Sequence, residues 1–312
     1  MHDMWEKMSR HMTLTLLFFL PQRKKKSLER RLRGREEFRK LQYADYILVS
    51  FGKSGRTWLR VMLSRFYQLK HDLPQRYLLG FDNLHRKNPN IPSVFFTHGN
   101  YLRDYTKNWD SKIDFYGKRI ILLVRDPRDI AVSQFFQWKY RMRPGKKVLN
   151  DYPAHGKDIS IFNFVMDSDA GLPKIIAWLN GWEREIPQIG QILLVRYEDM
   201  RTKPAVALKA ILAFLGTPGT DEQVEEAVAF ATYDNMKKLE QKKVFWLSGR
   251  RLLPRDRTNP DSYKVRRAKI GGYRDYFNDE EIVAIETLVN RTLAPSYGYT
   301  HNCLSEQQAA IL

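Results

Sequence analysis

The sequence predicts an α/β fold built on a parallel, doubly wound sheet, because short apolar segments alternate with segments of helical periodicity. In the first such unit, residues 46–58 read YILVSFGKSGRTW. An apolar strand is followed there by a loop that contains a lysine between two glycines. The second unit, 119–138, carries an apolar stretch at 120–124 before its own helix start. Further strands are expected at 93–97 and 191–196. Helical spacing of apolar residues follows the first loop (Leu59, Met62, Leu63 and Phe66) and precedes the last strand (Ile175, Ile176, Leu179 and Trp182).

The loop after the first strand has the composition of an anion-binding, P-loop-like turn. Gly52 and Gly55 allow a tight turn, and the free N–H groups of the following helix face any ligand that lies there. Lys53 adds a full charge, and the hydroxyls of Ser54 and Thr57 add donors. We expect this loop to hold a phosphate or sulfate group.

The helix start in the second unit is equally distinct. Asp126 suits the N-cap, Pro127 the first helical position and Asp129 the first turn. Arg125 lies at the carboxyl end of the strand, where ligands gather in open α/β sheets, and Ser133 follows early on the helix. Taken alone, Arg125 either binds an anion or pairs with one of the two aspartates.

Four segments together resemble a known family. Residues 53–58, KSGRTW, resemble the 5′-phosphosulfate loop of sulfotransferases that use 3′-phosphoadenosine 5′-phosphosulfate (PAPS), and 125–133, RDPRDIAVS, resemble their 3′-phosphate motif. Residues 195–200, VRYEDM, are similar to the strand end beside the adenine, and 266–273, RRAKIGGY, to the C-terminal R-x-G-x-x-G-x-W signature. The chain is therefore identified as a bacterial-like member of the PAPS-dependent sulfotransferase family, with a cytosolic-type domain.

The resemblance implies a donor-binding site and a reaction. PAPS is the donor co-substrate, no metal is expected, and the sulfuryl group passes by in-line displacement to a hydroxyl or amine. Lys53 is expected to neutralise charge on the leaving group. The other predicted residues bind three parts of PAPS. The 5′-phosphate is expected to contact Ser54, Gly55, Arg56 and Thr57, and the adenine to contact Trp58 and Tyr197. The 3′-phosphate is expected to contact Arg125, Ser133, Arg266, Arg267 and Ala268.

The candidate general base is His98, at the carboxyl end of the strand at 93–97. An imidazole suits removal of a hydroxyl proton near neutral pH. On position alone, a structural histidine is an equal alternative. The resemblance favours the catalytic role, since the family's catalytic histidine follows a threonine at the end of this strand.

Several positions depart from the family pattern. Phe96 replaces a lysine that cytosolic animal enzymes place before the histidine, and Arg56 replaces a common threonine. Ala268 replaces a glycine of the C-terminal signature, where its methyl group can crowd a phosphate contact, and Tyr273 replaces a tryptophan. Residues 278–279 lack the Thr-Val pair of the animal dimer segment, so the oligomeric state stays open.

Composition sets the partner classes. Lysine and arginine number 53 against 35 acidic residues, a net charge of +18. A basic cleft concentrates an anionic donor, and the excess leaves an acidic acceptor, an anionic membrane or nucleic acid open as partners. We expect no nucleic acid, because no recognition motif is evident. The single cysteine, Cys303, excludes an intrachain disulfide and favours the cytoplasm.

Two other function classes remain as alternatives. A small-molecule kinase or nucleotide hydrolase requires ATP and Mg²⁺, but Ile47 stands where the full loop G-x-x-x-x-G-K-[ST] has its first glycine, and Asp126 is the one candidate metal ligand. A nucleic-acid-binding or membrane-surface protein is explained by charge alone and gives His98 no role.

The expected organisation is a basic N-terminal extension at 1–42, a sulfotransferase domain at 43–300 and a tail at 301–312. The extension holds an apolar run at 12–20, too short to cross a bilayer, and a basic helix at 27–41, so residues 12–41 are a candidate contact with the cytoplasmic face of a membrane. Loops are expected at 71–92, 143–158 and 241–265, and the acceptor site at 71–92, 136–160 and 241–265. The acceptor class stays open among alcohols, phenols, lipids and saccharides.

Overall fold

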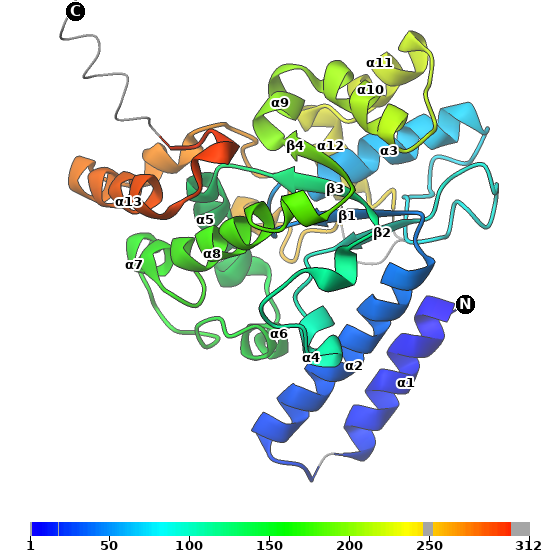
Figure 1. The fold of residues 1–312 in the computed structure, drawn as a ribbon. Coiled ribbons are helices and arrows are strands. Elements are labelled where there is room, and N and C mark those ends of the chain that lie inside the picture. Colours follow the sequence, from blue (N-terminus) through cyan, green and yellow to red (C-terminus); the bar gives the residue numbers. More distant parts are fainter. Residues whose placement is uncertain (1, 18, 246–251, 301–312) are drawn as a thin grey trace, which may run out of the picture.

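A computed structural model describes residues 2–17, 19–245 and 252–300 of the chain. Its centre is a sheet of four parallel strands in the order β2-β1-β3-β4 (Figure 1). The strands are β1 (Tyr46–Ser50), β2 (Val94–Thr97), β3 (Arg119–Val124) and β4 (Gln191–Arg196). All four predicted strands are confirmed to within one residue.

Helices cover both faces of this sheet, as the doubly wound prediction requires (Figure 1). Side chains alternate along β1, so Leu48 packs into one core and Ile47 and Val49 into the other. The Leu48 core is closed by α3 (Arg56–Lys70), α10 (Pro204–Phe214), α11 (Asp221–Phe230) and α12 (Tyr233–Lys242). The Ile47 core is closed by α5 (Pro127–Phe136), α7 (Ile161–Met166), α8 (Leu172–Glu183) and α13 (Asp279–Thr292).

The other helices are α1 (His2–Leu16), α2 (Gln22–Tyr43), α4 (Leu102–Thr106), α6 (Pro144–Leu149) and α9 (Tyr197–Thr202). A π-helical turn at Gln137–Arg141 extends α5, and 3₁₀ turns lie at 113–115, 186–188, 260–262, 272–276 and 295–297. None of the helices in the described ranges is long and apolar enough to span a membrane.

One loop prediction is wrong, because α6 lies inside 143–158. Pro144 is pre-organised for the first turn of this helix, and Leu149 and the stem of Lys147 are buried. The ammonium of Lys147 lies 4.6 Å from the ring centre of Trp138. Tertiary packing therefore stabilises a helix that the polar sequence does not indicate.

Helices α1 and α2 form a hairpin that projects from the sheet (Figure 1). The expected basic helix at 27–41 lies within the longer α2, whose Leu41 is fully buried in the core. At Gly34 an added Cβ would lie 2.2 Å from the carbonyl oxygen of Tyr101, so a side chain there would prevent this close contact. The proposed boundary at residue 42 stays a prediction, although α2 packs on the domain; the expected tail at 301–312 lies outside the described residues.

Candidate active site

The carboxyl ends of the four strands open into one cavity of about 460 Å³. Its walls come from the loop after β1, from the ends of β2, β3 and β4, and from segment 264–269. Residues far apart in sequence therefore meet at one place. Twelve of the thirteen predicted site residues line this cavity: Lys53, Gly55, Arg56, Thr57, Trp58, His98, Arg125, Ser133, Tyr197, Arg266, Arg267 and Ala268.

Ser54 is the exception among the predicted site residues. Its side chain is buried and does not line the cavity, and no described atom forms a hydrogen bond with its Oγ. Buried hydroxyls are normally paired in folded proteins. Because the side chain of Ser54 does not line the cavity, its contact with the 5′-phosphate stays a prediction.

The loop between β1 and α3 has the shape of an anion cradle. Lys53 and Gly55 both have left-handed backbone conformations, with φ of 76° and 90°. A Cβ on Gly55 would lie 2.5 Å from the ring of Tyr197, so only glycine fits this approach. Helix α3 begins directly at Arg56 without a side-chain cap, which leaves its first N–H groups available to a ligand.

The cavity is strongly cationic. Nine of its lining residues are lysine or arginine, against two carboxylates. Burial lowers the pKa of Lys53 well below its usual 10.5, and the positive charges of Lys264, Arg141 and Arg125 lower it further. Burial and neighbouring arginines lower the pKa of Lys264 to about 7. A bound polyanion would relieve this repulsion, so the residues present fit a phosphorylated and sulfated nucleotide.

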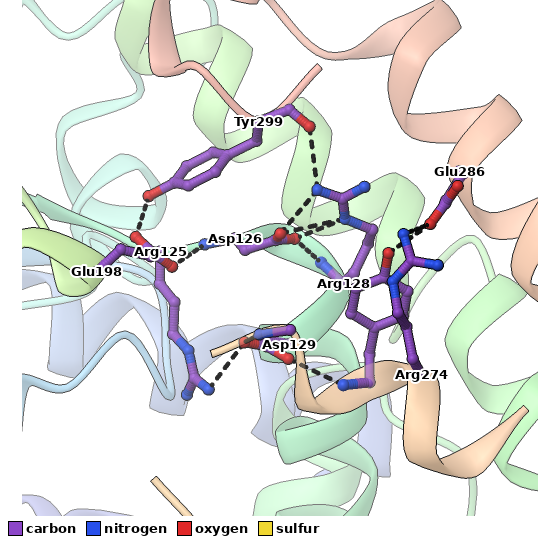
Figure 2. A network of polar contacts seen from close by, with 10 residues as sticks. Arg125, Asp126, Arg128, Asp129, Glu198, Arg274, Glu286 and Tyr299 are labelled. Carbon is purple, nitrogen blue, oxygen red and sulfur yellow. Dashed lines mark hydrogen bonds and ion pairs between the residues drawn. The ribbon is translucent and has the colours of Figure 1, made fainter. Parts of the chain in front are cut away.

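Arg125 both lines the cavity and takes part in an ion pair, so the two interpretations of its role coexist. Its Nη2 lies 3.3 Å from Oδ2 of Asp129 (Figure 2). The same oxygen accepts the backbone N–H of Gly271, and Oδ1 accepts that of Tyr273, each at 3.0 Å. The guanidinium lies 4.3 Å from the ring centre of Tyr197. Asp129 thus fixes Arg125 against the C-terminal signature.

Asp126 is committed to structure. It caps α5 by accepting the backbone N–H of Arg128 at 2.9 Å, and its other oxygen accepts Nη2 of Arg128 at 2.7 Å (Figure 2). Its own N–H donates to Glu198, which accepts the hydroxyl of Tyr299 at 2.6 Å. The kinase alternative needs this aspartate for Mg²⁺, and the ion pair opposes that use. Within the described ranges, no three His, Cys, Asp or Glu side chains are grouped to hold a metal ion.

His98 lies where its Nε2 faces the loop after β1. Its Nδ1 lies 2.7 Å from the carbonyl oxygen of Ser50, which can only accept, so Nδ1 carries the proton. The lone pair on Nε2 therefore points to Nη2 of Arg56, 2.6 Å away. Burial and the charge of Arg56 lower the pKa of His98 well below 6.5, so the imidazole is neutral at physiological pH.

The predicted adenine and 3′-phosphate residues have further partners. The indole N–H of Trp58 donates to the carbonyl of Ala231 at 2.8 Å, and its ring meets that of Tyr197 edge-on, with centroids 5.9 Å apart. The guanidinium of Arg266 lies 3.7 Å from the ring centre of Phe136. Arg267 donates to Asp275 at 2.6 Å, and Ala268 has a left-handed backbone with φ of 52°.

Sequence reasoning missed several residues that line the cavity, chiefly Glu37, Tyr101, Lys146 and Lys264. Glu37 and Lys146 belong to segments treated as an extension and a loop. Burial raises the pKa of Glu37 to about 7 and lowers that of Lys146 to about 8. Lys146 and Lys264 fall within 136–160 and 241–265, two of the segments expected to form the acceptor site, although neither residue was named there.

Known proteins share this chain's sequence pattern and fold. The family model described as "Sulfotransferase domain" matches residues 44–296. "Cytosolic sulfotransferase 17" of Arabidopsis thaliana is 24% identical over 280 residues, covering 81% of this chain and 75% of the relative. "Cytosolic sulfotransferase 7" of the same plant is 28% identical over 231 residues, covering 64% and 66%.

Two solved structures have a similar fold. A mouse sulfotransferase, SULT7A1, complexed with PAP, superposes with a TM-score of 0.54 at 22% identity, covering 82% of this chain and 89% of that one. A retinol dehydratase complexed with retinol and PAP gives a TM-score of 0.53 at 17% identity, covering 79% and 80%. The chain therefore belongs to the sulfotransferase domain family, as its motifs predict, and is a PAPS-dependent sulfotransferase.

Proposed function

We propose that this protein transfers the sulfuryl group of PAPS to a hydroxyl or amine of an acceptor by in-line displacement, with His98 as general base. The observation that supports this most is a cationic cavity in which residues of four separate motifs meet beside a neutral imidazole. PAPS supplies the sulfuryl group when it is bound. All other steps fall to the side chains of the chain.

His98 has the protonation state that the role requires. The Ser50 carbonyl fixes the proton on Nδ1, so Nε2 is the basic atom that faces the acceptor. Nη2 of Arg56 lies 2.6 Å from Nε2 of His98, so the guanidinium must turn away before an acceptor oxygen can approach this nitrogen. An anion in the loop at 53–57 would attract the guanidinium, so we infer that the donor binds before the acceptor.

The donor roles follow the cavity walls. Lys53 stabilises charge on the leaving oxygen. The loop backbone at 54–57 and the hydroxyl of Thr57 hold the 5′-phosphate, and Trp58 and Tyr197 flank the adenine. The 3′-phosphate is held by Arg125, Ser133 and the segment 266–268.

Lys264 is the candidate for a charge that the family pattern supplies elsewhere. Phe96 occupies the usual lysine position, and its ring lies 3.7 Å below the guanidinium of Arg60. Lys264 lines the same cavity and its charge acts on both Lys53 and His98. We infer that it contributes to the stabilisation of the transferring group.

The decisive experiment is transfer from isotope-labelled PAPS to a panel of alcohols, phenols, lipids, saccharides and amines. We expect His98→Asn to lower kcat by about 10²- to 10⁴-fold, the usual contribution of a general base, while PAP affinity is unchanged. His155→Asn, at an exposed histidine, is the matched control. Transfer by His98→Asn within twofold of the parent rate would reject His98 as the base. ATP hydrolysis that requires Mg²⁺, without sulfuryl transfer, would support the kinase or hydrolase class instead.

We also propose that the enzyme works in the cytoplasm and contacts an anionic membrane through residues 12–41. Met12, Leu16 and Phe19 are 62%, 70% and 67% exposed, next to exposed Arg23 and Lys24. Apolar side chains beside basic ones combine two weak membrane signals.

Vesicle sedimentation tests this contact. We expect binding to vesicles that contain phosphatidylserine, little binding to pure phosphatidylcholine, and loss of binding in a Leu16→Ser, Phe19→Ser variant. Failure of the parent protein to bind either kind of vesicle would contradict the proposal.

A further inference from the structure

The cavity continues past His98 on the β2 side of the sheet. There its lining comes from α2, from the start of α4 and from the region of α6, and none of these segments belongs to a donor motif. Three of the donor motifs follow β1, β3 and β4, whereas β2, at one edge of the sheet, ends directly before His98. Beyond the base, this side is where an acceptor has to lie. We name it the acceptor wall, formed by Glu37, Asn100, Tyr101, Met142, Lys146, Asn150 and Tyr152.

The acceptor wall is polar. Only Met142 among its seven residues is apolar. The ammonium of Lys146 lies 3.2 Å from the hydroxyl of Tyr101, which donates to Oδ1 of Asn150 at 2.8 Å. The hydroxyl of Tyr152 accepts Nε2 of Gln134 at 2.7 Å. Hydrogen-bond donors and acceptors are thus fixed along one side of the cavity.

Glu37 adds the one carboxylate of this wall. It accepts the backbone N–H of Tyr101 at 3.3 Å, which connects α2 to the start of α4. Arg56 and Lys146 exert positive charge on it, and Nη2 of Arg56 lies 2.6 Å from Nε2 of His98, so this carboxylate lies on the same side of the cavity as the candidate base.

An apolar ring placed against this wall would cover the donors that these bonds leave over, which are the other N–H groups of the Lys146 ammonium and the O–H of Tyr152, and a covered donor is costly in a buried site. A molecule with several hydroxyls satisfies them. We infer that the acceptor is a polyhydroxylated, sugar-like compound. This rests on the proposed sulfuryl transfer and narrows its substrate class.

The test compares kcat/KM for two acceptor groups after PAP binding has been measured by calorimetry. The polyhydroxylated group is maltose, lactose and methyl α-glucoside; the apolar group is 2-naphthol and androsterone. We expect at least about tenfold higher kcat/KM for a saccharide than for either apolar acceptor.

Two variants test whether the acceptor wall causes the preference for saccharides. Lys146→Met and Tyr101→Phe each remove a donor and keep most of the side-chain volume. We expect each to lower kcat/KM for the saccharide by about three- to tenfold, the usual effect of one lost hydrogen bond, with PAP affinity unchanged. Lys238→Met, at an exposed lysine on α12 outside the cavity, is the matched control and should leave both values unaltered.

The outcomes distinguish an error in the acceptor class from an error in the donor assignment. Intact PAP binding with equal or faster transfer to 2-naphthol or androsterone, or with no transfer to any saccharide, would overturn the acceptor class alone. Saccharide transfer that neither wall variant reduces would also overturn the assignment to this wall. Failure to bind PAP would overturn the donor assignment together with it.

Discussion

Replacing Lys264 by methionine should stabilise the free protein and weaken its hold on the donor. The substitution keeps the aliphatic stem and removes the charge. The backbone around residue 264 stays anchored, because its N–H donates to the two carboxylate oxygens of Glu240 at 2.8 and 3.0 Å. Burial and the charges of Arg141, Arg56 and Arg60 make the ammonium costly in the free protein.

The structure sets the size of this effect. The pKa of Lys264 falls from 10.5 to about 7, which corresponds to roughly 4 kcal/mol of free energy at pH 7. Water in the cavity reduces this value, so we expect a gain of about 1–4 kcal/mol in the free energy of unfolding. The folded pKa lies below the unfolded one, so the unfolded chain binds more protons between about pH 7 and 10.5. The parent therefore gains stability as pH rises through that window, and the variant's advantage shrinks by up to about 1.4 kcal/mol per pH unit.

Urea unfolding at pH 7 and pH 9.5 measures the gain, and calorimetry measures PAP affinity. We expect a PAP Kd about ten- to 100-fold weaker in the variant, the usual loss for one charged hydrogen bond. Lys238→Met, at an exposed lysine on α12, should change neither quantity. A Lys264→Met protein that is no more stable than the parent at pH 7, or that binds PAP equally well, would refute the reasoning.

Three further substitutions test separate contacts. Arg56→Met removes the cation beside His98 and should raise the pKa of that histidine toward 6.5, so the acid limb of the pH profile of kcat/KM moves to higher pH; an unmoved limb would contradict the electrostatic coupling. Asp129→Asn loosens Arg125 and the backbone at 271–273, and calorimetry should give a PAP Kd about five- to tenfold weaker, whereas an unchanged Kd would show that Asp129 does not position them. Ala268→Gly relieves a left-handed alanine, worth about 1 kcal/mol, but adds a similar entropy to the unfolded chain; thermal unfolding should change little and PAP affinity should hold or improve, and a tenfold loss of affinity would contradict this.

The sheet and the donor motifs were predictable because their signals are local. Apolar runs mark β1 and β3, and the capping residue Asp126 marks the start of α5 within a few positions of the strand. Parallel strands then bring their carboxyl ends together by topology alone. For this reason twelve of thirteen predicted site residues meet in one cavity.

The acceptor side was predictable only in part. Four of its seven wall residues lie in the expected segment 136–160, whereas long-range packing brings in Glu37, Asn100 and Tyr101. Helix α2 reaches the cavity only because Gly34 allows close contact with Tyr101, 67 positions later in the chain. The contact between Arg56 and His98 joins a helix start to a strand end 42 positions apart. Gly34 and Tyr101 belong to no sequence motif, and the motifs that contain Arg56 and His98 do not indicate that these two side chains meet.

Other predictions lie outside the described residues. Cys303 is among these, as are residues 246–251 of the segment 241–265 that was expected to form part of the acceptor site.

The most direct test of the account is a calorimetric comparison of PAP with AMP, which lacks the 3′-phosphate. The account predicts a saturable titration with PAP and at least about tenfold weaker binding of AMP, because Arg125 and the segment 266–268 would lose their phosphate. No binding of PAP, or equal affinity for the two nucleotides, would contradict the claim that one cationic cavity binds both the 5′ end and the 3′-phosphate of the donor.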